Sequence, residues 1–431
     1  MSSPTVTATP ALGNENNSEV EVKAPISWRN PVASLVLTIL GALLIPFTTG
    51  VSVFSFAGAT SWFTIPNLSV PARPALFILV FIAAALTALI WVRALQRKPA
   101  SGWFLAGVGL AFILTFLIWV VADNPNAVMP VVRLLAGALA LAVPLVFGSF
   151  SGLVCERSGI INIAIEGQLL AGAFLGAVVA SMIGNPWVAL IAGPVAGMMV
   201  ATLLALFTIK YRVDHIIVGV VLNMLVLGLT TFLYSSVLSS NEGFYNKAMP
   251  LPKLKIPVLA DIPVLGPVFF NQSILIYLMY GIAIALQFLV FNSRWGLRMR
   301  AVGEHPKAAD TVGIKVIYTR WMNTLIGGAL AGLGGAFFTV GAGMPFSKNM
   351  AAGNGFIALA AMILGRWNPK GALAAAALFG FATNLGFIMQ TVGSPVPFEF
   401  LLMIPYLVTI LAVAGFVGRV RAPAAEGKPY P

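Results

Sequence analysis

The sequence predicts an all-α protein, a polytopic membrane helix bundle of about 12 transmembrane helices with both termini in the cytoplasm (N-in/C-in). Hydrophobic residues make up 59% of the 431 residues, charged residues make up only 9%, and the mean hydropathy is +0.95. Soluble domains carry about 25% charged residues. Apolar segments of roughly 20 residues, the length that crosses a bilayer core, recur along the chain. The 42 glycines suit helices that pack closely inside a membrane.

These apolar segments predict the individual spans in chain order. The tenth is short, which favours a broken or re-entrant helix over a full crossing. The predicted spans cover residues 31–50, 74–92, 103–121, 131–150, 163–182, 187–209, 216–238, 273–291, 321–341, 355–365, 371–390 and 399–417.

The distribution of positive charge predicts the orientation. With the N-terminus in the cytoplasm, 19 of the 25 Lys and Arg residues fall inside and 6 fall outside. Cytoplasmic loops of membrane proteins are enriched in Lys and Arg. The opposite orientation would invert this ratio.

Polar sequence divides the chain into four parts. Residues 1–28 lack the apolar stretch of a signal peptide and predict a disordered cytoplasmic tail. Residues 29–129 hold three helices without intramembrane polar clusters, which indicates an N-terminal addition. Residues 130–421 form the core, and residues 422–431 form a second cytoplasmic tail.

Several classes of function find no support in the sequence. The net charge of +12 lies in small clusters without a basic stripe, which argues against nucleic-acid binding. Cys155 is the only cysteine and His215 and His305 lie far apart, so we expect no disulfide and no metal site. The chain has no phosphate-binding loop for ATP and no catalytic cluster, so we expect neither an enzyme nor a cofactor of its own.

A basic cytoplasmic loop, residues 294–313, is the most informative polar segment. Pro306 suits the first position of a helix and Gly313 suits its C-terminal cap. The loop therefore predicts a small helix over residues 307–312 that docks onto a cytoplasmic partner through Ala308 and Ala309. The alternative is an ordinary basic loop that only sets topology.

A second polar segment, residues 158–168, enters the fifth predicted span. Its polar members are Asn162, Glu166 and Gln168. Asn162 and Glu166 are four residues apart, so a helix would place them on one face. A carboxylate inside a membrane usually faces a cavity or a partner. The segment predicts a substrate-path or gating element, or else a structural pairing of Glu166 with Arg157 or another neighbour.

A third polar segment leads into the short tenth span. Asn349 and Asn354 precede an apolar run of about ten residues that ends before Arg366. This pattern predicts a discontinuous helix whose N-terminal N–H groups face a polar solute. The alternative is a tight external turn. Asn223 and Asn384 lie within other spans, where an amide binds a polar solute or holds two helices together.

The core resembles the permease subunit of a bacterial ABC importer, within the simple-sugar and branched-chain amino acid permease superfamily and nearest its nucleoside-importer permeases. The resemblance rests on five stretches that are specific as a set, namely residues 156–168, 262–266, 295–304, 355–369 and Pro405-Tyr406. It implies a bacterial cytoplasmic (inner) membrane protein that takes up nucleosides by alternating access. The implied partners are a cytoplasmic ABC ATPase that binds the ATP, a second permease subunit in a heterodimer, and an external substrate-binding lipoprotein.

The resemblance also implies that the cytoplasmic loop couples the ATPase to the membrane, through Arg300, Gly303, Glu304, Pro306, Ala308, Ala309 and Gly313. The expected substrate path comprises Asn162, Glu166, Gln168, Asn223, Asn349, Asn354 and Asn384. Alternative cargoes are sugars or branched-chain amino acids. An ion-coupled secondary transporter is a rival of a different class, but it would show an intramembrane relay of carboxylates and histidines, and Glu166 stands nearly alone.

Overall fold

The computed structural model describes residues 28–56, 58, 62–63, 65–98, 101–122, 124, 127–393, 396–397, 400, 403 and 421–431. The predicted N-terminal tail lies outside the described residues, except for Trp28. Most of the last predicted span and the Pro405-Tyr406 stretch lie outside them as well.

Among the described residues, nine helices are long and apolar enough to cross a membrane, which confirms a polytopic helical protein. The count of 12 and the orientation stay predictions. Two further apolar helices are shorter, α1 (Arg29–Leu43) and α13 (Asn354–Leu364). The 11 residues of α13 confirm that the tenth predicted segment is short. The spanning helices are α2 (Ala72–Leu95), α3 (Gly102–Val121), α4 (Val131–Glu156), α5 (Ile165–Ile183), α6 (Ala189–Ala205), α7 (His215–Leu233), α9 (Ile274–Asn292), α12 (Val316–Ala336) and α14 (Pro369–Thr391), of which α6, α7 and α12 continue into the π-helical turns η2 (Leu206–Lys210), η3 (Tyr234–Leu238) and η6 (Phe337–Gly341).

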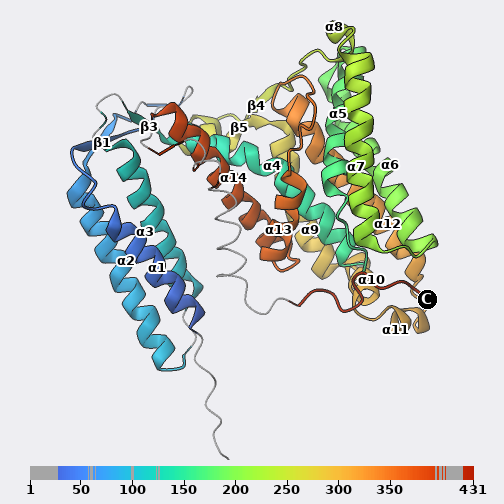
Figure 1. Ribbon diagram of the computed structural model, residues 1–431, viewed down its shortest axis with the longest axis horizontal. Helices are drawn as coiled ribbons and strands as arrows, with labels where there is room; N and C mark the ends of the chain where they lie inside the picture. The colour runs from blue at the N-terminus through green and yellow to red at the C-terminus, as the bar shows by residue number, and fades with distance from the viewer. Residues whose placement is uncertain are drawn as a thin grey trace, which may run out of the picture.

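The N-terminal helices α1, α2 and α3 lie side by side at one edge of the molecule (Figure 1). A small sheet, which the sequence analysis did not predict, closes one end of this group. In it β1 (Val51–Ser55) pairs antiparallel with β2 (Leu68–Pro71) and parallel with β3 (Val128–Pro130). The group packs on the core where Leu76 and Ile118 share a buried cluster with Leu385 and Met389 of α14.

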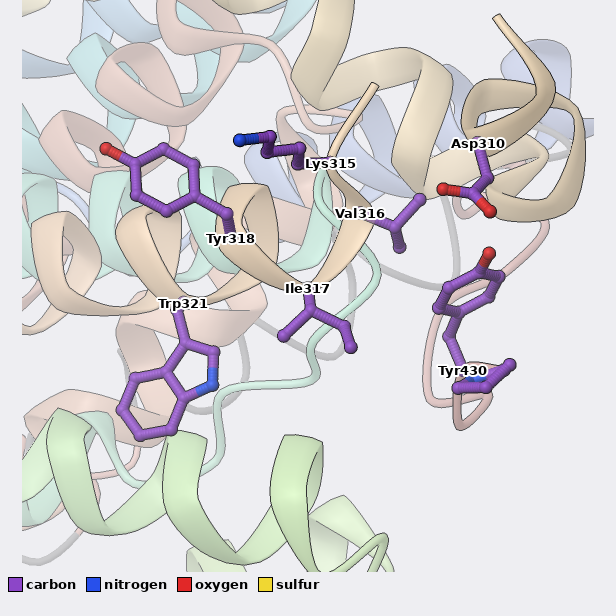
Figure 2. A pocket seen from close by; sticks show the side chains of 8 residues that line it. Asp310, Lys315, Val316, Ile317, Tyr318, Trp321 and Tyr430 are labelled. Atoms are coloured by element: carbon purple, nitrogen blue, oxygen red, sulfur yellow. The ribbon is translucent and has the colours of Figure 1, made fainter. Parts of the chain in front are cut away.

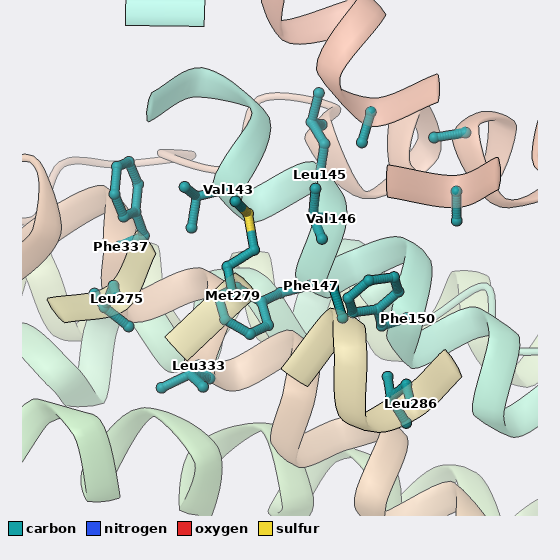
Figure 3. Close-up of a cluster of buried hydrophobic side chains, with 14 of the residues drawn as sticks. Val143, Leu145, Val146, Phe147, Phe150, Leu275, Met279, Leu286, Leu333 and Phe337 are labelled. Carbon is teal, nitrogen blue, oxygen red and sulfur yellow. The ribbon is translucent and has the colours of Figure 1, made fainter. Parts of the chain in front are cut away.

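Helix α4 lies at the centre of the core. Its Phe147 and Phe150 are fully buried and belong to one cluster with Met279 of α9 and Leu333 of α12, and Figure 3 shows these side chains. In a bilayer such close packing, rather than exclusion of water, holds helices together. Helix α4 thereby joins α9, α12 and α14.

Glycines allow α5, α6 and α12 to touch through their backbones. A Cβ added to Gly172 of α5 would overlap the carbonyl of Gly332, and one added to Gly197 of α6 would overlap the carbonyl of Gly328. Any side chain at these positions would push the helices apart, so glycine is required.

The longer connections lie at opposite ends of the bundle (Figure 1). At one end are α8 (Glu242–Tyr245), the 3₁₀ turn η4 (Leu259–Asp261), the π-helical turn η5 (Gly266–Phe270) and the hairpin of β4 (Lys253–Lys255) with β5 (Asn271–Ser273). At the other end are α10 (Arg294–Glu304), α11 (Pro306–Thr311) and the C-terminal tail.

Candidate functional site

Glu166 joins two of the polar segments that the sequence analysis singled out. Its Oε1 accepts the backbone N–H of Gly353 at 2.7 Å, and its Oε2 accepts that of Gly355 at 2.6 Å. These N–H groups belong to the first turn of α13, where backbone donors lack partners within the helix. The carboxylate of α5 therefore caps α13, and it does not pair with Arg157. The N–H groups that were expected to face a solute face Glu166 in this conformation.

Asn162, which precedes α5, and Gln168, in the first turn of α5, form a second polar contact, and both side chains are fully buried. The Asn162 Nδ2 donates to Gln168 Oε1 at 3.0 Å and to Ser151 Oγ at 3.0 Å. The expectation that Asn162 shares a helix face with Glu166 is wrong, because α5 begins only at Ile165. Asn162 lies in the turn before the helix and points to α4 instead.

Asn223 and Asn384 hold helices together. Asn223 of α7 accepts the Gly167 N–H at 2.8 Å and donates to the Ile163 carbonyl at 2.9 Å. Asn384 of α14 donates to the Leu134 carbonyl of α4 at 2.7 Å. Both amides use their polar atoms on backbone groups of a neighbouring helix or of the turn that leads into it, the commoner role of an amide within a span.

Asn349 and Asn354 lie around the loop before α13. Asn349 is exposed and adopts a left-handed backbone conformation, with φ of 54°. Asn354 is partly buried, and its Nδ2 donates to the Ala351 carbonyl at 2.7 Å. The first turn of α5 thus contacts both the first turn of α13, which carries Asn354, and Asn223 of α7. Asn384 lies elsewhere, at the contact between α4 and α14.

A cavity of about 780 Å³ opens at the end of the bundle that carries β4 and β5. Its walls come from the first turns of α4, from β5 and from η6, and none of the seven expected path residues is among the described residues that line it. The buried Oγ of Ser273 has no hydrogen-bond partner among the described residues, and it lies at this cavity. No periodic pattern in the sequence marks these residues as a set, because they come from a loop and from two helix ends. The polar members are Arg133, Lys253, Asn271, Gln272 and Ser273.

The small helix predicted over residues 307–312 is confirmed as α11. Pro306 occupies its first turn, and Gly313 follows it with a positive φ of 82°. The expected Ala-Ala contact face is wrong, however, because Ala309 is 2% exposed and packs with Val302 and Val316. Ala308 alone of the two is exposed.

The other residues expected to couple the ATPase are partly used within the chain. Arg300 lies over the ring of Phe291 at 5.5 Å and donates to the Gly296 carbonyl at 3.4 Å. Gly303 packs against the Arg157 carbonyl so closely that a Cβ would overlap it. Arg157 donates from Nη2 to the Trp367 carbonyl at 2.7 Å, and burial and then the nearby charge of Arg300 lower its pKa. Glu304 is exposed.

Beside α11 lies a groove of about 720 Å³, whose walls come from α11, the start of α12 and the last two residues of the chain. Figure 2 shows Tyr430 and Asp310 facing one another across one side of it. Tyr318 and Ile317 on its rim are exposed. Val316, Ile317 and Trp321 make its walls largely apolar.

Residues 134–413 match the family described as the branched-chain amino acid transport system permease component. The chain belongs to this permease family. It is 40% identical over 324 residues to the guanosine ABC transporter permease protein NupQ of Bacillus subtilis, an alignment that covers 70% of this chain and 98% of NupQ. It is 38% identical over 314 residues to the nucleoside ABC transporter permease protein NupC of Lactococcus lactis, covering 71% and 98%.

A putative glucose ABC transporter permease protein, TsgC13 of Haloferax volcanii, is 34% identical over 257 residues, covering 58% of this chain and 76% of that protein. No solved structure gives a significant match. These comparisons confirm an ABC permease, a multi-pass protein of the bacterial cell membrane that is a transport subunit and not an enzyme. Membership of this family implies an ATPase and a substrate-binding protein as partners.

Proposed function

We propose that this permease takes up nucleosides by alternating access, powered by a separate ATPase that binds the ATP and supplied by an external binding lipoprotein. The observation that carries the proposal is the similarity to NupQ and NupC, since this chain aligns with 98% of each. The proposal includes 12 helices, with both termini in the cytoplasm, and no cofactor in the permease itself. It also includes the division into an N-terminal addition up to residue 129 and a core from residue 130.

A second, related permease completes the proposed transporter as a heterodimer. Two relatives from each of two organisms support this. The chain is 40% identical to NupQ and 27% identical to NupP of Bacillus subtilis, and 38% identical to NupC and 25% identical to NupB of Lactococcus lactis. The chain is thus more similar to NupQ and NupC than to NupP and NupB, and we expect its partner permease to resemble NupP and NupB.

The groove beside α11 is the proposed contact for the ATPase, because it lies at the end of the bundle that the charge distribution places in the cytoplasm. The cavity at the opposite end is the proposed entrance for the nucleoside. Its amide and hydroxyl groups suit a neutral solute with hydroxyls and ring nitrogens. Glu166 and Asn354 near α13, with Asn162, Gln168, Asn223, Asn349 and Asn384, remain the proposed polar path.

Uptake by the assembled transporter in proteoliposomes tests the proposal. Labelled guanosine should accumulate when ATP and the binding lipoprotein are both present, and unlabelled nucleosides should compete with it. Labelled glucose and leucine are the matched controls, and neither should accumulate. Accumulation of glucose or leucine in place of guanosine would show that the substrate is not a nucleoside. Accumulation of guanosine without the ATPase would favour an ion-coupled transporter.

A further inference from the structure

The C-terminal tail, residues 421–431, folds back onto three separate segments of the core. The Ala425 N–H donates to the carbonyl of Gly303 at the end of α10, at 2.9 Å. The Gly427 N–H donates to the carbonyl of Gly159 in the turn between α4 and α5, at 3.1 Å. Residues 424–427 form a turn, and the backbone of this turn bonds the tail to the core.

A buried arginine of α12 completes this attachment. Arg320 is 2% exposed, and its Nη1 donates to the carbonyl of Lys428 at 2.9 Å. Its Nε and Nη2 have no hydrogen-bond partner among the described residues. Gly159, with φ of 92°, leaves the space that the guanidinium occupies, since a Cβ there would lie 2.8 Å from Nη2.

A buried guanidinium is costly without acceptors. The carbonyl of Lys428 is the one acceptor that the Arg320 side chain has within the described part of the chain. The tail therefore supplies the hydrogen-bond acceptor of a buried side chain of the core.

Two carboxyl groups meet under the tail. Glu426 is hydrogen-bonded to Glu156, which is 3% exposed at the end of α4. The Glu156 Oε2 also accepts the indole N–H of Trp367 at 2.6 Å. A hydrogen bond between two carboxyl groups requires a proton on one of them. The side chain of Glu426 thus adds a contact with Glu156 of α4, which is itself bonded to the α13–α14 turn.

The far end of the tail is bonded to the cytoplasmic helices. Tyr430 is hydrogen-bonded to Asp310 of α11, and with Pro431 it forms one wall of the groove in Figure 2. The Ala424 N–H donates to Glu304 Oε2 at 3.3 Å. One short segment thus connects α10 and α11 with the α4–α5 turn and α12.

We infer that residues 421–431 are a coupling strap that carries a movement of α10 and α11 to the α4–α5 turn, with Arg320 and Glu426 as positioning residues. This inference rests on the proposed function, in which the ATPase contacts α11. The turn leads from Gly159 to the buried Asn162 and then to Glu166, the cap of α13. A displacement of α10 and α11 would therefore move the residues of the polar path through the hydrogen bonds of the eleven-residue tail.

Uptake and ATP hydrolysis, measured together in proteoliposomes, test the strap. Deletion of residues 424–431 should lower nucleosides transported per ATP about tenfold while the ATPase still co-purifies. Glu426→Ala should give a partial loss, and Glu426→Gln, which can still bond to Glu156, should restore much of it. Lys428→Ala is the matched control, because the strap uses only the backbone carbonyl of that residue.

If the tail were only structural, its deletion would lower uptake and ATP hydrolysis in proportion. A deletion variant that transports as many nucleosides per ATP as the unmodified transporter would therefore overturn the inference. If the deletion variant fails to insert into the membrane, the same ratio of nucleosides transported per ATP is measured in Glu426→Ala and Tyr430→Phe. An unchanged ratio in both variants would overturn the inference. Absence of guanosine uptake in the unmodified transporter would instead count against the proposed function.

A distance measurement tests the strap independently of cargo. Spin labels at Lys428→Cys and Thr311→Cys report whether the tail and α11 move as one unit, and both positions are exposed. The distance should be the same with ATP and with ADP bound to the partner. A distance that differs between the two states would overturn the inference.

Discussion

Glu166 of α5 and Gly355 of α13 are joined by a 2.6 Å hydrogen bond between a membrane carboxylate and a helix N-terminus. The second oxygen of the same carboxylate binds Gly353 at 2.7 Å. The positive end of the α13 dipole and two unpaired donors are thereby satisfied by one side chain. This contact connects the two polar segments that precede α5 and α13.

Removal of this cap should impair transport. Glu166→Ala leaves both N–H groups without a partner, and each such loss in a buried site costs about 1–3 kcal/mol. We expect uptake to fall at least about tenfold while membrane insertion is retained. Glu166→Gln retains one acceptor oxygen, so its uptake should lie between that of the unmodified protein and that of Glu166→Ala. Glu242→Ala, which changes an exposed carboxylate on α8, is the control. Unchanged uptake in Glu166→Ala would remove Glu166 from the path.

Asn223 offers a test of the link between α5 and α7. Asn223→Ala removes both hydrogen bonds, whereas Asn223→Asp retains an acceptor for the Gly167 N–H and, when protonated at low pH, can also donate to the Ile163 carbonyl. We expect the Ala variant to melt at lower temperature than the Asp variant at low pH, and both to show reduced uptake. If neither Asn223→Ala nor Glu166→Ala reduces uptake, the proposed path is refuted.

Gly303 should be intolerant of any side chain. An added Cβ would overlap the carbonyl of Arg157, and overpacking of this kind costs about 1–3 kcal/mol. We expect Gly303→Ala to lower the melting temperature of the purified protein and to loosen the C-terminal tail, which is bonded to the Gly303 carbonyl. Gly281→Ala on α9 is the matched control, because a Cβ there meets no atom within 4 Å. Equal melting temperatures would contradict the close contact.

Attachment of the tail should weaken as pH rises. Burial raises the pKa of Glu426 above the ordinary glutamate value of 4.5. A raised pKa means that the attached tail binds more protons than the free tail, so attachment is strongest below 4.5 and is lost as pH rises through the raised pKa. The ionisable group in contact with Glu426 is Glu156. The tail also contacts Arg320 through the Lys428 carbonyl, Glu304 through the Ala424 N–H and Asp310 through Tyr430.

A spin label at Lys428→Cys measures this effect, since the native Cys155 is buried. Its mobility should increase with pH through the window just above 4.5. In Glu426→Gln the amide cannot titrate, so the change in mobility with pH should be smaller over the same range. A label that becomes less mobile as pH rises would contradict the assignment of the proton to the carboxyl pair.

Local signals in the sequence predicted local structure correctly. Pro306 and Gly313 define α11 because helix caps depend on residues within one turn. The short α13 followed from the length of its apolar run. The shared face of Asn162 and Glu166 was wrong, because periodicity does not reveal where a helix begins, and α5 begins after Asn162.

Contacts between distant residues could not be predicted in this way. Arg320 and Lys428 are 108 positions apart, and no spacing rule connects a tail to a buried arginine. Asn223 and Asn384 were recognised as polar groups within spans, but their partners are backbone carbonyls, which carry no sequence signal. The strands of the two small sheets have only three to five residues, too few for an alternating pattern to stand out.

The glycine contacts among α5, α6 and α12 have a consequence for how the protein can move. Helices that touch backbone to backbone, as at Gly172 with Gly332 and Gly197 with Gly328, cannot slide without collision of main-chain atoms. These three helices therefore travel as a single rigid body. The Glu166 cap joins this body, through α5, to the first turn of α13.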